Sequence, residues 1–166
     1  MNSLIVYFSH AGENYFSGKI KNIEVGNVKK TAMIIKDIVD VDMFELIEVD
    51  KYPSDYSLCT KRAKEELLNN CSIAYKDDID VSNYDCIYLG YPNWWNTMPL
   101  IVRGFLENSD LSNKHIYPFC LHQGSGFGSS LDDLKKLCPN SIIHKGLSLY
   151  EIDKENIERW VKEDDR

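Results

Sequence analysis

Short apolar runs alternate with helix-like patterns along the whole chain, and this alternation constrains the fold more than any other feature. The runs that are typical of strands cover residues 4–8, 43–50, 85–91, 115–122 and 141–149. Segments with apolar residues at helical spacing cover residues 27–40, 55–70, 99–108, 128–138 and 153–165. The first run, LIVYF, is continuously apolar, which is typical of a strand buried on both faces. Strands that alternate with helices predict a parallel sheet with helices on both faces.

The pattern therefore predicts an α/β, doubly wound, five-stranded fold in a single domain over residues 1–166. A chain of 166 residues, 43% of them hydrophobic, has the size and composition of one ordinary domain. On the predicted helix at 55–70, we expect Leu58, Ala63, Leu67 and Leu68 to face inward. In such folds ligands bind beyond the carboxyl ends of the strands, where the strand order reverses. The loops after the first, third and fourth predicted strands are therefore the candidate site.

Charge and cysteine content exclude several classes of protein. The formal net charge is -7 without a basic block, which argues against a nucleic-acid partner. The cysteines are Cys59, Cys71, Cys86, Cys120 and Cys138. Their odd number and wide spacing argue against a disulfide framework or a zinc site, and favour reduced thiols in a cytoplasmic protein. The N-terminal apolar run is too short for a signal peptide or a membrane span.

The loop at 9–27 has the composition of an anion site. It starts with small and hydrogen-bonding residues and ends at Gly26 and Asn27, where a helix is predicted to begin. A helix N-terminus offers unpaired N–H groups and the positive end of the helix dipole. The loop matches neither GxxxxGK[ST] nor GxGxxG. On this stretch alone, a phosphate site and an ordinary turn-rich loop are equally compatible with the residues.

The segment GYPNWWNTMP at 90–99 places Trp94 and Trp95 side by side in a predicted loop. Neighbouring residues in an extended segment point in opposite directions, so the two rings do not share one core. One ring can pack on the edge of the core while the other faces a ligand.

The segment HQGSGFGSS at 122–130 is rich in glycine. Gly124, Ser125 and Gly126 follow the fourth predicted strand without the spacing of a dinucleotide fingerprint or of a hydrolase elbow. His122 is more typical of a structural histidine at a strand end than of a catalytic one. The three loops together suit a phosphorylated, planar, aromatic ligand.

Three motifs, LIVYFSHAGENY, GYPNWWNTMP and PFCLHQGSGFGSS, resemble the flavodoxin-like FMN-binding proteins. The resemblance is greatest to the bacterial subgroup with an insertion that extends the phosphate loop, and it covers nearly the whole chain. It implies the strand order 2-1-3-4-5 and FMN as the cofactor.

The resemblance also implies which residues bind the cofactor. The phosphate site would comprise Ser9, His10, Ala11, Asn14, Asn27 and Val28. One loop beside the isoalloxazine ring would comprise Pro92, Asn93, Trp94, Trp95 and Asn96. The other would comprise His122, Gly124, Ser125 and Gly126. No catalytic residue and no metal ligand are implied.

The chain departs from the family pattern at three positions. His10 follows Ser9 where arginine or another residue is frequent, and Val28 stands where the family has threonine. Asn96 stands where glycine is common after the aromatic pair, so its side chain can alter how the loop approaches the flavin. The threonine hydroxyl is thus absent. The backbone N–H groups and Ser9 would therefore make a larger share of the hydrogen bonds to the phosphate.

The resemblance favours electron transfer through a non-covalently bound flavin. The alternative is an FMN-dependent NAD(P)H:acceptor oxidoreductase of the quinone type, because the family includes carriers and enzymes. The redox partner is then a protein or a small-molecule acceptor, and both a monomer and a homodimer are open. A phosphoacceptor receiver is disfavoured, because the first and third strands end without acidic residues.

Overall fold

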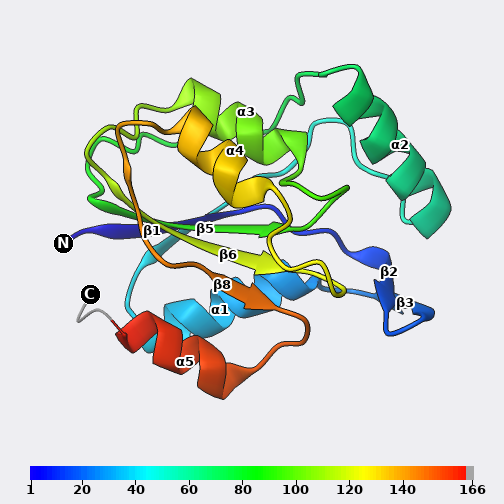
Figure 1. The fold of residues 1–166 in the computed structure, drawn as a ribbon, viewed down its shortest axis with the longest axis horizontal. Coiled ribbons are helices and arrows are strands. Elements are labelled where there is room, and N and C mark those ends of the chain that lie inside the picture. Colours follow the sequence, from blue (N-terminus) through cyan, green and yellow to red (C-terminus); the bar gives the residue numbers. More distant parts are fainter. Residues whose placement is uncertain (164–166) are drawn as a thin grey trace.

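A parallel sheet forms the centre of the molecule, which the computed structural model describes over residues 1–163 (Figure 1). Its strands are β1 (Ser3–Tyr7), β4 (Asp42–Glu45), β5 (Cys86–Pro92), β6 (His115–Leu121), β7 (Ile142–Ile143) and β8 (Leu147–Leu149). They lie in the order β4-β1-β5-β6-β7, and β8 also pairs with β6. Because β7 and β8 divide the last predicted strand, this is the predicted order 2-1-3-4-5. The predicted doubly wound α/β fold is confirmed.

Helices cover both faces of the sheet (Figure 1). On one face lie α1 (Asn27–Ile38) and α5 (Lys154–Lys162), which contact each other. On the other lie α2 (Tyr56–Leu68), α3 (Leu100–Asn108) and α4 (Ser130–Leu137). No helix within residues 1–163 is long and apolar enough to cross a membrane.

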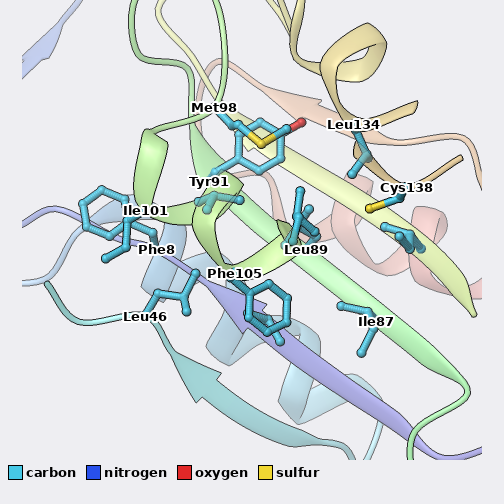
Figure 2. Close-up of a cluster of buried hydrophobic side chains, with 14 of the residues drawn as sticks. Phe8, Leu46, Ile87, Leu89, Tyr91, Met98, Ile101, Phe105, Leu134 and Cys138 are labelled. Atoms are coloured by element: carbon cyan, nitrogen blue, oxygen red, sulfur yellow. The ribbon is translucent and has the colours of Figure 1, made fainter. Parts of the chain in front are cut away.

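Each central strand sends alternate side chains into two separate cores. Leu4 and Val6 of β1 pack in the core beneath α3, whereas Ile5 and Tyr7 pack in the core above α1 and α5. Figure 2 shows the first core, where Phe105 of α3 lies among the strand side chains. Full burial of one such side chain contributes roughly 1.5–3 kcal/mol, which explains why these strands are continuously apolar.

The helix ends agree closely with the sequence pattern. Asp153, the first residue of the helix predicted at 153–165, caps α5, because its carboxylate accepts a hydrogen bond from the Asn156 N–H at 3.1 Å. Pro99, the first residue of the helix predicted at 99–108, immediately precedes α3 as its N-cap residue. The last residues of the helix predicted at 153–165 lie outside the described part of the chain.

The stretch at 9–27, interpreted from sequence as a loop, contains a β-hairpin. Strand β2 (Gly12–Phe16) pairs antiparallel with β3 (Lys19–Ile23), apart from the main sheet. Ser17 and Gly18 form the turn with φ values of 46° and 87°, as two-residue hairpin turns require. The strands were missed because GENYF and KIKNI are mostly polar and lack a continuous apolar run.

Two other predicted strands are shorter than expected. The strand predicted at 43–50 ends at Glu45, where its pairing with β1 ends. The strand predicted at 141–149 is interrupted at residues 144–146, between β7 and β8. Both lie toward the edges of the sheet, where fewer neighbours hold the backbone extended.

Candidate functional site

A cleft of about 580 Å³ opens at the carboxyl ends of β1, β5 and β6. Within residues 1–163 it is lined by His10, Glu13, Asn14, Tyr15, Phe16, Asn27, Val28, Tyr56, Cys59, Thr60, Ala63, Pro92, Asn93, Trp94, Trp95, Leu121, His122, Gln123, Gly124, Ser125 and Tyr150. This is where the strand order reverses, since β1 lies between β4 and β5. The volume falls in the range of sites for cofactor-sized ligands.

The N-terminus of α1 forms one end of the cleft, through Asn27 and Val28. The N-cap residue is Gly26, which has no side chain that could cap the helix. Ser9 replaces such a cap, because its hydroxyl oxygen accepts the Lys29 N–H at 3.1 Å. The first two helical N–H groups have no partner within the helix and carry partial positive charge. This end of the cleft can therefore bind an anion.

His10 lies against an aromatic corner of the cleft. Its ring makes edge contacts with Trp94 and Tyr52, at centroid distances of 5.8 and 6.4 Å. Its Nε2 is buried and has no hydrogen-bond partner among the described residues. Burial lowers the pKa of His10, against a smaller opposing effect of the Glu48 carboxylate.

Trp94 and Trp95 are the first two residues of a tight turn. Trp94 and Thr97 exchange backbone hydrogen bonds, and Trp95 and Asn96 between them have φ of 53° and 71°. This is the geometry of a type I′ turn, which suits asparagine but is strained for tryptophan. Strain of this kind is often kept at functional sites.

The environments of the two rings differ. Trp94 makes edge contacts with Phe8 and Tyr52 and backs onto the core. Trp95 is 47% exposed, donates its indole N–H to the Thr60 carbonyl, and lies beneath the Lys64 ammonium. Trp95 is therefore the ring that is held in place while staying accessible.

Asn93 connects this turn by hydrogen bonds to the 122–130 loop, which forms the opposite wall of the cleft. Its side-chain N–H groups donate to Ser125 Oγ at 3.0 Å and to the Gly126 carbonyl at 2.9 Å. His122 Nδ1 accepts the Gly124 N–H at 2.9 Å, which folds the start of this loop. The two loops thus hold each other at a fixed separation.

The hairpin β2–β3 closes a third side. At its base, the Glu13 carboxylate accepts the Tyr56 N–H at the start of α2. At its tip, Ser17 N–H donates to the Gln123 side chain, and the Ser17 and Tyr150 hydroxyls lie 2.7 Å apart. The hairpin therefore joins α2 to the loops that follow β6 and β8.

Most of the residues predicted from sequence lie together in this cleft. Those in its lining are His10, Asn14, Asn27, Val28, Pro92, Asn93, Trp94, Trp95, His122, Gly124 and Ser125. Among the described residues, four of the predicted ones do not line the cleft: Ser9, Ala11, Asn96 and Gly126. Ser9 and Gly126 support it through the hydrogen bonds above. The Asn96 carbonyl accepts from Ser129 N–H and Oγ, so it is held by the 122–130 loop.

Sequence reasoning missed the hairpin and one face of α2. Tyr56, Cys59, Thr60 and Ala63 line the cleft, and their spacing of three and four residues is the signal that could have revealed them. The expectation that Leu58 and Leu68 face inward is wrong, since they are 58% and 75% exposed. Burial raises the pKa of the Cys59 thiol to about 12, so it stays protonated at neutral pH.

We expect the ligand-free protein to lose stability as the pH falls from 7.5 to 5.5. Burial lowers the pKa of His10 and of His122 below the ordinary value of about 6.5. In that window the unfolded chain therefore binds protons that the folded chain does not, and unfolding becomes easier. Urea unfolding at both pH values checks this. The double variant His10→Gln, His122→Gln should lose much of the pH dependence, and an unchanged dependence would contradict the assignment.

Fold and cleft place the chain in the flavodoxin-like class of doubly wound α/β proteins. The family model described as Flavodoxin matches residues 4–164, and the chain belongs to this family. No curated protein matches the chain in sequence.

Solved structures resemble the chain over nearly its full length. A protein from Bacteroides eggerthii, provisionally named a flavoprotein, is 26% identical with a TM-score of 0.79, covering 96% of this chain and 95% of that one. One from Bacteroides uniformis, named in the same way, is 24% identical with a TM-score of 0.78, covering 97% of each chain. A flavoprotein from Lactobacillus acidophilus in complex with FMN is 20% identical with a TM-score of 0.66, covering 97% and 99%.

Proposed function

We propose that this chain binds FMN and transfers electrons through the non-covalently held flavin. The observation that carries the proposal is one cleft that combines the free N-terminus of α1 with the two tryptophans at the carboxyl edge of the sheet. Membership of the flavodoxin family and the FMN complex of the Lactobacillus acidophilus relative support the same cofactor.

The residues present fit a phosphate at the α1 end. The backbone N–H groups of Asn27 and Val28 would bind it, with the helix dipole favouring its charge. Val28 brings no hydroxyl, but the Ser9 hydroxyl, which accepts the Lys29 N–H, keeps its own O–H to donate to a phosphate. Phosphate binding would therefore depend on backbone N–H groups, on Ser9 and on His10.

The residues also fit a flat ring at the other end of the cleft. Trp95, fixed by Thr60 and covered by Lys64 on one face, would stack on the ring, with Trp94 behind the turn. The wall formed by His122, Gly124 and Ser125 would enclose the opposite side. These residues bind and orient the ring and exclude water from it.

When bound, the flavin supplies reversible electron transfer, and the surrounding protein sets how readily it is reduced. The Glu13 carboxylate lines the cleft, and the chain carries a formal net charge of -7. Both oppose added negative charge at the cofactor. We therefore expect a low reduction potential, which suits a donor of electrons.

The visible spectrum of the purified protein tests the proposal. We expect the absorption of an oxidised flavin, acid release of FMN, and restoration of the spectrum when FMN is added back. Redox titration should then give a potential below that of free FMN. A colourless protein that FMN cannot reconstitute would refute the proposal.

An NAD(P)H-dependent reductase is the second candidate, favoured by the aromatic mouth of the cleft. The ring centroids of Tyr15, which is 41% exposed, and Tyr56 lie 6.2 Å apart. Both residues line the same cleft as Trp95. Such rings could hold a second planar molecule over the flavin. Steady-state oxidation of NADH or NADPH with a quinone acceptor distinguishes an enzyme from a carrier, which would turn over only slowly.

The cysteines support a reducing compartment such as the cytoplasm. All five are free thiols, and those other than Cys71 are buried. In this proposal the electron acceptor is a partner protein or a small molecule, and the protein acts as a monomer or a homodimer.

A further inference from the structure

His10 is a polar group in the cleft whose bonding is incomplete. Its Nε2 is shielded from solvent and has no hydrogen-bond partner within the described chain, although the imidazole as a whole lines the cleft. A buried polar atom without a partner is unfavourable and uncommon in native proteins. Rotation about Cβ–Cγ is soft for histidine, so an occupant of the cleft could meet either ring nitrogen.

The backbone of His10 lies at the end of the cleft that can bind an anion. A Cβ atom on Gly26, the N-cap of α1, would lie 2.8 Å from the His10 carbonyl oxygen. The His10 backbone therefore borders the first N–H groups of α1. The imidazole lies against Trp94, and the two ring centroids are 5.8 Å apart.

The surroundings of the ring disfavour its protonated form and lower the pKa of His10. Burial against Trp94 and Tyr52 opposes the imidazolium, and the Glu48 carboxylate favours it only in part. Glu13 of the hairpin lines the same cleft, and Lys29 of α1 pairs with Glu45 at 3.5 Å. A phosphate with two negative charges beside the ring would outweigh burial and favour the protonated form.

We propose that His10 takes up one proton from solvent when a phosphomonoester dianion binds at the α1 N-terminus, and that the imidazolium donates a hydrogen bond to it. This inference rests on the proposed function, because FMN is the phosphomonoester considered. His10 is then a specificity residue: it favours ligands with a terminal dianionic phosphate over the same ring system without one.

Calorimetry of FMN binding in buffers of different ionisation enthalpy tests the proposal. At pH 7.5, where a phosphomonoester is mostly dianionic, wild type should take up about one proton per FMN. Riboflavin, which lacks the phosphate, should bind without proton uptake. Log Kd for FMN should rise with pH in this range, and log Kd for riboflavin should stay level.

Two substitutions separate the charge from the packing. His10→Phe keeps an aromatic ring and should weaken FMN binding by about tenfold to a hundredfold, the typical effect of losing a hydrogen bond to a charged group. Riboflavin affinity should be unchanged. His10→Gln can still donate a hydrogen bond, so it should recover part of the FMN affinity without proton uptake. His115→Gln, at the far end of β6, should retain the proton uptake.

FMN binding with no proton uptake, or with equal uptake in wild type and His10→Phe, would overturn this inference and leave the proposed function standing. Failure of wild type to bind FMN at all would instead refute the proposed function. Circular dichroism and urea unfolding of each variant show whether a loss of binding follows from misfolding.

Discussion

Replacing Gly26 with alanine should weaken FMN binding roughly a hundredfold, a loss of about 3 kcal/mol. A Cβ at this position would lie 2.8 Å from the His10 carbonyl oxygen and still closer to Ser9 Oγ. The backbone φ of -65° is open to any residue, so the effect comes from space alone. The loop must move away from α1, which breaks the Ser9–Lys29 hydrogen bond and displaces the N–H groups that would bind phosphate. Fluorescence titration of FMN measures the loss.

The matched control for this prediction is Gly104→Ala. Gly104 lies within α3, and its new Cβ would have an ordinary contact, 3.8 Å from the Ile73 carbonyl oxygen. Alanine in a helix interior is favoured over glycine by roughly 0.5–1 kcal/mol, so this variant should unfold no more easily than wild type and bind FMN equally. Equal FMN affinity in the Gly26 and Gly104 variants would contradict the first prediction.

Replacing Gly90 with alanine should destabilise the fold by about 1–3 kcal/mol or more, the usual cost of overpacking a core. Gly90 of β5 pairs directly with Phe119 of β6, and the Phe119 ring folds over it. An added Cβ would lie 2.9 Å from Phe119 Cε1 and closer to two other ring atoms. Phe119 is fully buried, so its ring cannot move out of the way. Urea unfolding of the ligand-free protein gives the change in stability.

A smaller partner at position 119 should reverse part of this loss. Phe119→Leu alone leaves a cavity, but in Gly90→Ala, Phe119→Leu the new methyl group occupies some of that space. The stability changes should therefore not add, with an interaction of roughly 0.5–3 kcal/mol in favour of the double variant. Simple additivity would show that the ring is not what resists the new Cβ.

The central sheet could be predicted because its signals are local. β1, β5 and β6 are buried on both faces, so their residues must be apolar almost without interruption. The caps at Asp55 and Asp153 mark helix starts equally locally, since each side chain bonds within its own first turn. These features depend on neighbours in sequence and on burial alone.

The hairpin could not be predicted in this way, because distant residues hold it. Strand β3 is largely exposed and β2 is only half-buried. Contacts with Ser54, Tyr56 and Gln123 fix the position of the hairpin. The roles of the tryptophans were equally open. They are assigned by the turn at Trp95 and Asn96, by the hydrogen bond from Trp95 to Thr60 of α2, and by the edge contacts of Trp94.

Ser17 at the hairpin tip has a consequence for how the cleft can open. It contacts Gln123 and Tyr150, which are 106 and 133 residues away along the chain, and both contacts are hydrogen bonds between exposed groups. Contacts of similar sequence separation between α1 and α5 are made instead by buried apolar side chains. Exposed hydrogen bonds with little buried apolar surface open most easily, so the hairpin tip can come away while the sheet and its cores stay folded. A cofactor can thus enter through a local opening that leaves the rest of the molecule intact.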